Sequence, residues 1–139
     1  MANSYGRMRT NYFRTTDLEA LKRILKRCST DGEKIELFER QEHGENLYAF
    51  GCEFSFRGYF VSGSDEWDFD SFTTDLQKVV AEKDSVIVFE IGYEKIKWLY
   101  SEATIITAER IKSLEMPRLA RECAADMLGN KDYFTQIEY

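Results

Sequence analysis

Apolar and polar residues alternate along this chain in two rhythms, one typical of strands and one typical of helices. Segments rich in aromatic and β-branched residues predict strands at residues 8–15, 35–41, 47–54, 59–62, 85–91 and 95–106. The segment 85–91 is almost continuously apolar, which is typical of a strand covered on both faces. Gly92-Tyr93-Glu94 then predicts a turn, and the long strand 95–106 is expected to break near Ser101 and Glu102. A hairpin loop is expected at residues 43–46.

Three segments have the 3.6-residue periodicity of amphipathic helices. The first begins at Thr16-Asp17-Leu18-Glu19, which has the form of a capping box with Thr16 as the cap, and it ends before Asp31. The second covers about residues 70–82. The third follows Pro117 and ends near Gly129. Its expected buried stripe consists of Met116, Leu119, Ala120, Cys123 and Met127.

The predicted order is β-α-β-β-(β)-α-β-β-α, with no linker between its parts. Hairpins alternating with one-sided helices indicate a single α+β domain over residues 1–139, with a mainly antiparallel sheet and helices mostly on one face. The aromatic tail 130–139 is expected to dock against the body or on a second subunit, which would make a homodimer.

Composition narrows the class of protein. The chain has 43% hydrophobic residues, which supports a folded core rather than disorder. Its three cysteines, Cys28, Cys52 and Cys123, lack the close spacing of a zinc or redox motif, so buried thiols are expected. The first residues contain no apolar leader and no stretch has the length of a membrane span. These features lead us to expect a cytoplasmic protein.

Common catalytic and metal motifs are absent. His43 is the only histidine and falls in the predicted hairpin loop, where a solvated side chain is expected. No G-x-S-x-G elbow, P-loop or dinucleotide-binding motif occurs. The acids Glu66, Asp68 and Asp70 alternate as in a calcium loop, but Ser71 and Gln77 stand where that loop needs Gly and Glu. The sequence therefore predicts a protein without metal or cofactor and without enzymatic activity.

Charge is divided unevenly along the chain. The net charge is −6, yet residues 1–29 carry seven bases and two acids. Residues 62–94 carry nine acids and two lysines. Such polarity bears on the choice of partners, since charged surfaces steer association.

The acidic segment contains the most distinctive stretch, SGSDEWDFDSF at 62–72. One or two of its acids suit the start of the second helix, whose positive end they would stabilise. The remaining acids and an indole match a contact surface for a protein with a basic groove, because Trp is a frequent binding anchor. The predicted partner-binding residues are Asp65, Glu66, Trp67, Asp68 and Asp70.

Two alternatives stay open. The first helix places Lys22, Arg23, Lys26 and Arg27 on one outer face, which could neutralise phosphates of a nucleic acid. The second alternative is an enzyme of unfamiliar design that uses carboxylates such as Glu90 and Glu94.

The strings RTNYF (9–13), FEIGYEKIKWLY (89–100) and ATIIT (103–107) resemble those of small acidic proteins encoded by plasmids, phages and conjugative elements of Gram-positive bacteria. The resemblance carries over no catalytic residues. It implies an accessory protein of a mobile element, and such proteins often counter host defence. An inhibitor of a host nucleic-acid-handling enzyme, of the anti-CRISPR or anti-restriction type, is the function it suggests.

Overall fold

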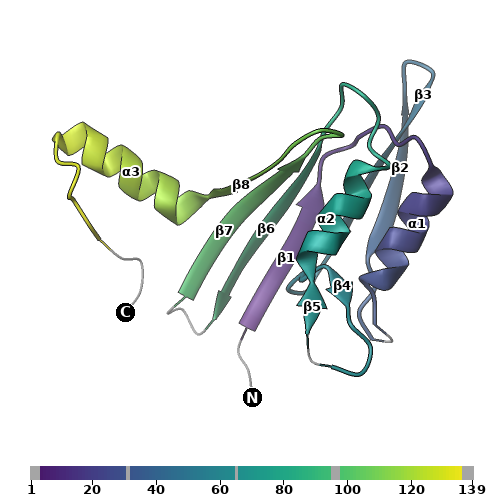
Figure 1. Ribbon diagram of the computed structural model, residues 1–139, viewed down its shortest axis with the longest axis horizontal. Helices are drawn as coiled ribbons and strands as arrows, with labels where there is room; N and C mark the ends of the chain where they lie inside the picture. Colours follow the sequence, from purple (N-terminus) through teal and green to yellow (C-terminus); the bar gives the residue numbers. More distant parts are fainter. Residues whose placement is uncertain (1–3, 31, 65, 95–97, 136–139) are drawn as a thin grey trace.

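The structure describes residues 4–30, 32–64, 66–94 and 98–135. In this computed structural model, one antiparallel sheet of six strands carries two helices on one face, and a third helix projects from its edge (Figure 1). The sequence predicted a single α+β domain with a mainly antiparallel sheet. The structure has this architecture, so the predicted fold class is confirmed.

The sheet has the strand order β2-β3-β1-β6-β7-β8, which places the first strand of the chain near its centre. Its members are β1 (Ser4–Thr10), β2 (Glu36–Glu42), β3 (Glu45–Cys52), β6 (Val86–Glu94), β7 (Trp98–Ile106) and β8 (Ile111–Glu115). Strand β1 pairs with β6 along its whole length but with β3 only through Met8 and Arg9. The strand therefore joins the β2–β3 hairpin to the β6–β7–β8 meander.

A two-residue turn, His43-Gly44, connects β2 and β3. Both residues have positive φ, 52° and 78°, and Glu42 pairs directly with Glu45. Positive φ at both positions is the type I′ arrangement, whose twist matches that of antiparallel strands. The hairpin was expected, but its predicted four-residue loop was too long because Glu45 and Asn46 belong to β3. His43 is exposed here, as expected.

Helices α1 (Leu18–Arg27) and α2 (Phe69–Gln77) lie side by side on one face of the sheet (Figure 1). Asp17 caps α1 by accepting a hydrogen bond from the Ala20 backbone N–H at 3.0 Å. The prediction that Thr16 is the cap was wrong by one residue, since the carboxylate of Asp17 takes this role. Glu19 forms an ion pair with Lys22 at 3.7 Å.

The core fills the space between these two helices and the sheet. Aromatic rings from separate parts of the chain meet edge to face there, with Phe50 of β3 at 6.1 Å from Phe13 and 6.4 Å from Phe72 of α2. Leu21 and Leu76, one from each helix, are fully buried beside them. This apolar layer supplies the main driving force for folding, because each large side chain removed from water contributes about 1.5–3 kcal/mol.

Strand β6 is covered on one face only. Val86 and Val88 point toward the helices and are fully buried, whereas Phe89 and Ile91 on the opposite face are 52% and 55% exposed. The prediction that this strand is covered on both faces was therefore wrong, because none of the described residues forms a second layer on the far side of the sheet. The turn predicted at Gly92-Tyr93-Glu94 was also wrong, as these residues continue β6.

Strands β7 and β8 complete the meander. Strand β7 is unbroken at Ser101 and Glu102, contrary to expectation, and β8 was not predicted at all. The five residues of β8 pair with residues 102–106 of β7, so the first part of β7 lies beyond the end of β8.

A tyrosine lies across two glycines on the helix-covered face of the sheet. Gly6, Gly92 and Tyr100 stand directly opposite one another on β1, β6 and β7. A Cβ atom at either glycine would collide with the side chain of Tyr100. The tyrosine hydroxyl reaches to 3.4 Å from Oγ of Ser55, in the segment that follows β3.

Helix α3 (Met116–Leu128) begins immediately after β8, with Glu115 as its N-cap residue, and ends at Gly129, whose φ is 63°. Figure 1 shows it projecting from the β8 edge, away from α1 and α2. None of its side chains is buried, so the predicted packing of its apolar stripe against the body was wrong. Within that stripe only Leu119 is half-buried; the exposed members are Met116, Ala120, Cys123 and Met127.

The position of α3 explains the exposure of Cys123 and of the described part of the tail that follows the helix. Cys28 and Cys52 are buried as expected, but Cys123 is exposed because it lies on the projecting helix. Residues 130–135 of the tail are exposed, and the Phe134 ring packs on the Arg121 guanidinium of α3 at 5.6 Å. The expected docking of the tail on the body does not occur in these residues, and positions 136–139 lie outside the described ones.

Candidate protein-binding surface

The distinctive acidic segment folds into a small two-stranded ribbon. Strand β4 (Tyr59–Phe60) pairs with β5 (Trp67–Asp68), and α2 begins at the next residue. The Phe60 and Trp67 rings meet edge to face with centroids 5.3 Å apart. Phe60 is 44% exposed and Val61 37%, while Trp67 is half-buried. We call residues 59–70 the acid–aromatic hairpin.

Of the described acids of this hairpin, one caps a helix and two are exposed at the surface. Asp68 caps α2 by accepting a hydrogen bond from the Ser71 backbone N–H at 2.9 Å. Hydrogen bonding by Ser71 holds the pKa of Asp68 below its usual value, so the carboxylate is the stable form. Glu66 and Asp70 are exposed. Asp65, also a predicted contact, lies outside the described residues.

Tight packing fixes the hairpin against α2. Gly58 precedes β4 with a φ of 87°, and a Cβ atom there would come within 2.6 Å of the Phe69 Cα. This close approach needs glycine for both its conformation and its small size. Phe69, at the start of α2, packs on the buried Phe56 ring with centroids 6.2 Å apart. The exposed Phe60 ring and the half-buried Trp67 ring therefore stand on a closely packed base.

A second contact ties the hairpin to α1. The Tyr59 hydroxyl donates to Oδ2 of Asp75 at 2.7 Å, and the Arg27 guanidinium covers the Tyr59 ring at 3.8 Å. Arg27 also approaches Asp75 at 3.5 Å. The hydrogen bond from Tyr59 lowers the pKa of Asp75, while burial, followed by that same bond, raises the pKa of Tyr59. Residues from α1, β4 and α2 thus form one polar cluster.

This cluster changes the interpretation of the basic face of α1. Arg27 is used within the fold, and Lys22 forms an ion pair with Glu19. Arg23 and Lys26 remain at the surface. Of the four predicted nucleic-acid contacts, two therefore have acidic neighbours that compete with phosphate.

The open face of the sheet is a further surface, which the sequence analysis missed. The register of β1, β6 and β7 places Phe89, Ile91 and Leu99 on the side opposite to α1 and α2. Each of the three is more than half exposed. Arg7 and Arg9 lie on the same side, directly opposite Ile91 and Phe89. The alternation of Phe89 and Ile91 with the polar Glu90 could have indicated an open face. The apolar residues that precede it suggested instead a strand that is covered on both faces.

Three glutamates form a row on the other face of the sheet. Glu90, Glu102 and Glu115 are directly opposite one another on β6, β7 and β8. Burial, and then the charge of Glu102, raises the pKa of Glu90 to about 7. The pKa of Glu102 is also raised, by burial and by Glu115. Of the carboxylates considered for catalysis, Glu90 therefore has a perturbed environment, whereas the side chain of Glu94 is outside the described set.

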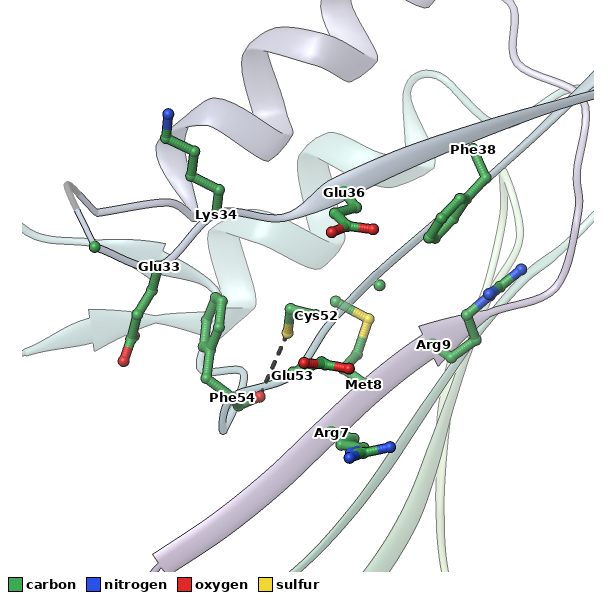
Figure 2. Close-up of a pocket in the computed structure, with 12 residues that line it drawn as sticks. Arg7, Met8, Arg9, Glu33, Lys34, Glu36, Phe38, Cys52, Glu53 and Phe54 are labelled. Carbon is green, nitrogen blue, oxygen red and sulfur yellow. Dashed lines mark hydrogen bonds between the residues drawn. The ribbon is translucent and has the colours of Figure 1, made fainter.

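A cavity lies elsewhere, between β1 and the ends of β2 and β3 (Figure 2). It has a volume of about 660 Å³. Its lining includes three basic and three acidic residues: Arg7, Arg9, Lys34, Glu33, Glu36 and Glu53. Figure 2 shows the Cys52 thiol at one side of it, bonded to the Phe54 carbonyl at 3.4 Å. Burial raises the pKa of this thiol, so it is a poor nucleophile.

A search of the described residues for metal-binding clusters and membrane-spanning helices and a comparison with known proteins gave no further candidate. Within the described part of the chain, no three His, Cys, Asp or Glu side chains gather in a way that could hold a metal ion. Among the same residues, no helix is long and apolar enough to span a membrane. No family model, curated protein or solved structure matches the chain.

Proposed function

We propose that this protein acts by binding another protein through its acid–aromatic hairpin. The observation that carries the proposal is the Phe60–Trp67 pair, in which Phe60 is exposed and Trp67 half-buried, with Glu66 and Asp70 at the surface beside it. Aromatic anchors surrounded by polar residues are the usual centre of a protein interface. The surface is small, so the partner would also contact the segments around it.

The partner that fits this surface has an apolar pocket bordered by bases. The carboxylates would steer such a partner into contact and would disfavour acidic competitors. Basic grooves of this kind are typical of enzymes that handle nucleic acids, since those enzymes must neutralise phosphates. The resemblance to proteins of mobile elements supports the narrower form of the proposal, in which the chain inhibits a host defence nuclease.

Nucleic-acid binding through α1 is the weaker alternative. Its basic face would have to release Arg27 from Asp75 and Tyr59 and Lys22 from Glu19 before using all four charges. The net charge of −6 also opposes the approach of a polyanion.

The test compares capture of host proteins by the wild type and by the double variant Phe60→Ser/Trp67→Ala. Phe134→Ser, which removes an exposed ring from the described part of the tail, is the matched control. We expect the wild type and the control to recover one nucleic-acid-handling enzyme and to inhibit it after purification, and the double variant to do neither. Equal recovery and inhibition by all three proteins would exclude the hairpin as the contact.

A further inference from the structure

Helix α3 presents an apolar stripe that the described residues leave uncovered. At 100° per residue, Met116, Ala120, Cys123 and Met127 fall within about 60° of one another. All four are exposed, and Met127 is 83% exposed. A surface helix normally turns such a stripe toward a core. The described residues of the tail do not cover the stripe, because Phe134 packs on Arg121, which lies on a different side of the helix.

The connection to β8 prevents α3 from turning back over its own sheet. Glu115 is both the last residue of β8 and the N-cap of α3, so no loop separates the two elements. The direction of the helix is therefore set by the direction of the strand. Figure 1 shows the consequence, since the far end of α3 lies well away from β6 and β7.

The open face of the sheet offers a surface of matching character. Phe89, Ile91 and Leu99 form an apolar strip over β6 and β7. Half-buried Ile105 and Leu114 lie on the same face, nearer to β8. Helices pack on sheets by covering such a strip, and an exposed strip of this kind marks an interaction site.

The charges beside the two apolar surfaces are complementary. On α3, Glu122 and Asp126 lie along one flank of the stripe, and both are exposed. On the sheet, Arg7 and Arg9 of β1 lie along one flank of the strip. Among the described residues, none forms an ion pair with any of these four side chains. Arg9 leans over the Phe38 ring at 4.4 Å, which leaves its charge at the surface.

We propose that the chain forms a two-fold symmetric dimer in which α3 of each copy packs on the open sheet face of the other. Each copy gives a helix and receives one, so the same contact occurs twice, as a closed dimer requires. The doubled contact brings the interface toward the roughly 800 Å² per partner that stable complexes bury. Methionines suit this contact because their flexible side chains adapt to the partner surface.

The dimer is tested by sedimentation velocity between about 1 and 100 μM, where a specific interface of moderate affinity shows its concentration dependence. We expect a reversible dimer for the wild type and at least about tenfold weaker association, the loss of roughly 1.4 kcal/mol, for Met127→Lys and for Ile91→Lys. Phe60→Ser, on the opposite side of the sheet, should associate like the wild type. A monomeric wild type, or variants that dimerise unchanged, would overturn the proposal.

A charge exchange distinguishes helix-on-sheet packing from other dimers. Arg7→Glu/Arg9→Glu reverses the sheet flank, and Glu122→Arg/Asp126→Arg reverses the helix flank. Each double variant alone should be monomeric, because like charges then meet in both contacts. An equimolar mixture should form a heterodimer, because each helix then meets a sheet of opposite charge. Failure of the mixture to associate, with both proteins folded by circular dichroism, would contradict this arrangement. Since Phe60 and Trp67 take no part, the result is independent of the proposed function.

Discussion

Glu90 and Glu102 face each other across β6 and β7, on the side of the sheet that α1 and α2 share. Two carboxylates directly opposite on neighbouring strands repel one another when both are ionised. The partial burial of Glu90 adds to this cost, since a charged carboxylate loses hydration there. A proton bound to Glu90 therefore stabilises the folded protein at pH values at which the unfolded chain has already released it.

The first prediction concerns pH. The pKa of Glu90 is about 7 in the folded protein against 4.5 for an unperturbed glutamate, so the folded state binds more protons between these values. The free energy of unfolding should consequently fall as pH rises from 4.5 to 7, by about 2 kcal/mol once solvent screening is allowed for. Urea denaturation of Glu90→Gln should show a smaller decrease over this range and greater stability than the wild type at pH 7.5. The exposed Glu109→Gln serves as control, and an unchanged slope in Glu90→Gln would contradict the assignment.

The second prediction concerns the polar cluster that links α1 to the hairpin. Arg27→Ala removes the cation over the Tyr59 ring and the ion pair with Asp75. We expect this change to lower the free energy of unfolding by about 1–2 kcal/mol in urea denaturation, because Asp75 and Tyr59 lose a shared partner. Lys26→Ala, the neighbouring exposed base, should change it by less than about 0.5 kcal/mol. Equal effects of the two substitutions would show that Arg27 is only a surface charge.

The third prediction separates the two described acids at the start of α2. Asp68→Ala should destabilise the protein by about 1 kcal/mol, because the Ser71 N–H loses its acceptor. Asp68→Asn should restore most of this loss, since an amide oxygen also caps a helix. Asp70→Ala should have a smaller effect in the same thermal or urea denaturation. If Asp70→Ala were the more damaging change, the cap would be assigned to the wrong residue.

The fourth prediction concerns thiol reactivity. In dilute solution, a disulfide reagent such as DTNB should modify one thiol per chain rapidly, and that thiol should be Cys123. Cys28 and Cys52 are buried, and burial raises the pKa of both thiols, so they should react only as the protein unfolds. Cys123→Ser should abolish the fast phase. A fast phase that persists in this variant would show that the interior opens locally.

Features decided by a few neighbouring residues could be predicted from the sequence. The hairpin around His43-Gly44, the entry of α3 at Pro117 and its end at Gly129 follow from local backbone chemistry, although the hairpin loop was expected to be two residues longer. A cap on α2 from an acid of the 62–72 stretch was expected for the same reason, and Asp68 supplies it. Even the error at Thr16 concerns a single position, since Asp17 offers the same kind of side-chain acceptor.

Features that depend on a missing neighbour could not be predicted. The apolar pattern of β6 indicates a strand but does not reveal whether a second layer covers Phe89 and Ile91. The stripe on α3 has the pattern of a buried face whether its partner is the same chain or another one. Strand β8 escaped notice because Ile111–Glu115 has little strand character of its own, and its pairing with β7 defines it. In the acid–aromatic hairpin, likewise, Phe60 gains its place beside Trp67 only through the pairing of β4 with β5.

The tyrosine that lies across Gly6 and Gly92 has a consequence for how this chain can vary. The three positions, on three different strands, share one volume, so a change at any of them alters what the others can hold. An alanine at 92 would expel the ring of Tyr100, and a small residue at 100 would relieve Gly92 of its restriction, whereas Gly6 would still be confined by Ser55. Homologous sequences should accordingly show positions 92 and 100 substituted together, and a library that randomises both at once should yield folded combinations that single replacements cannot reach.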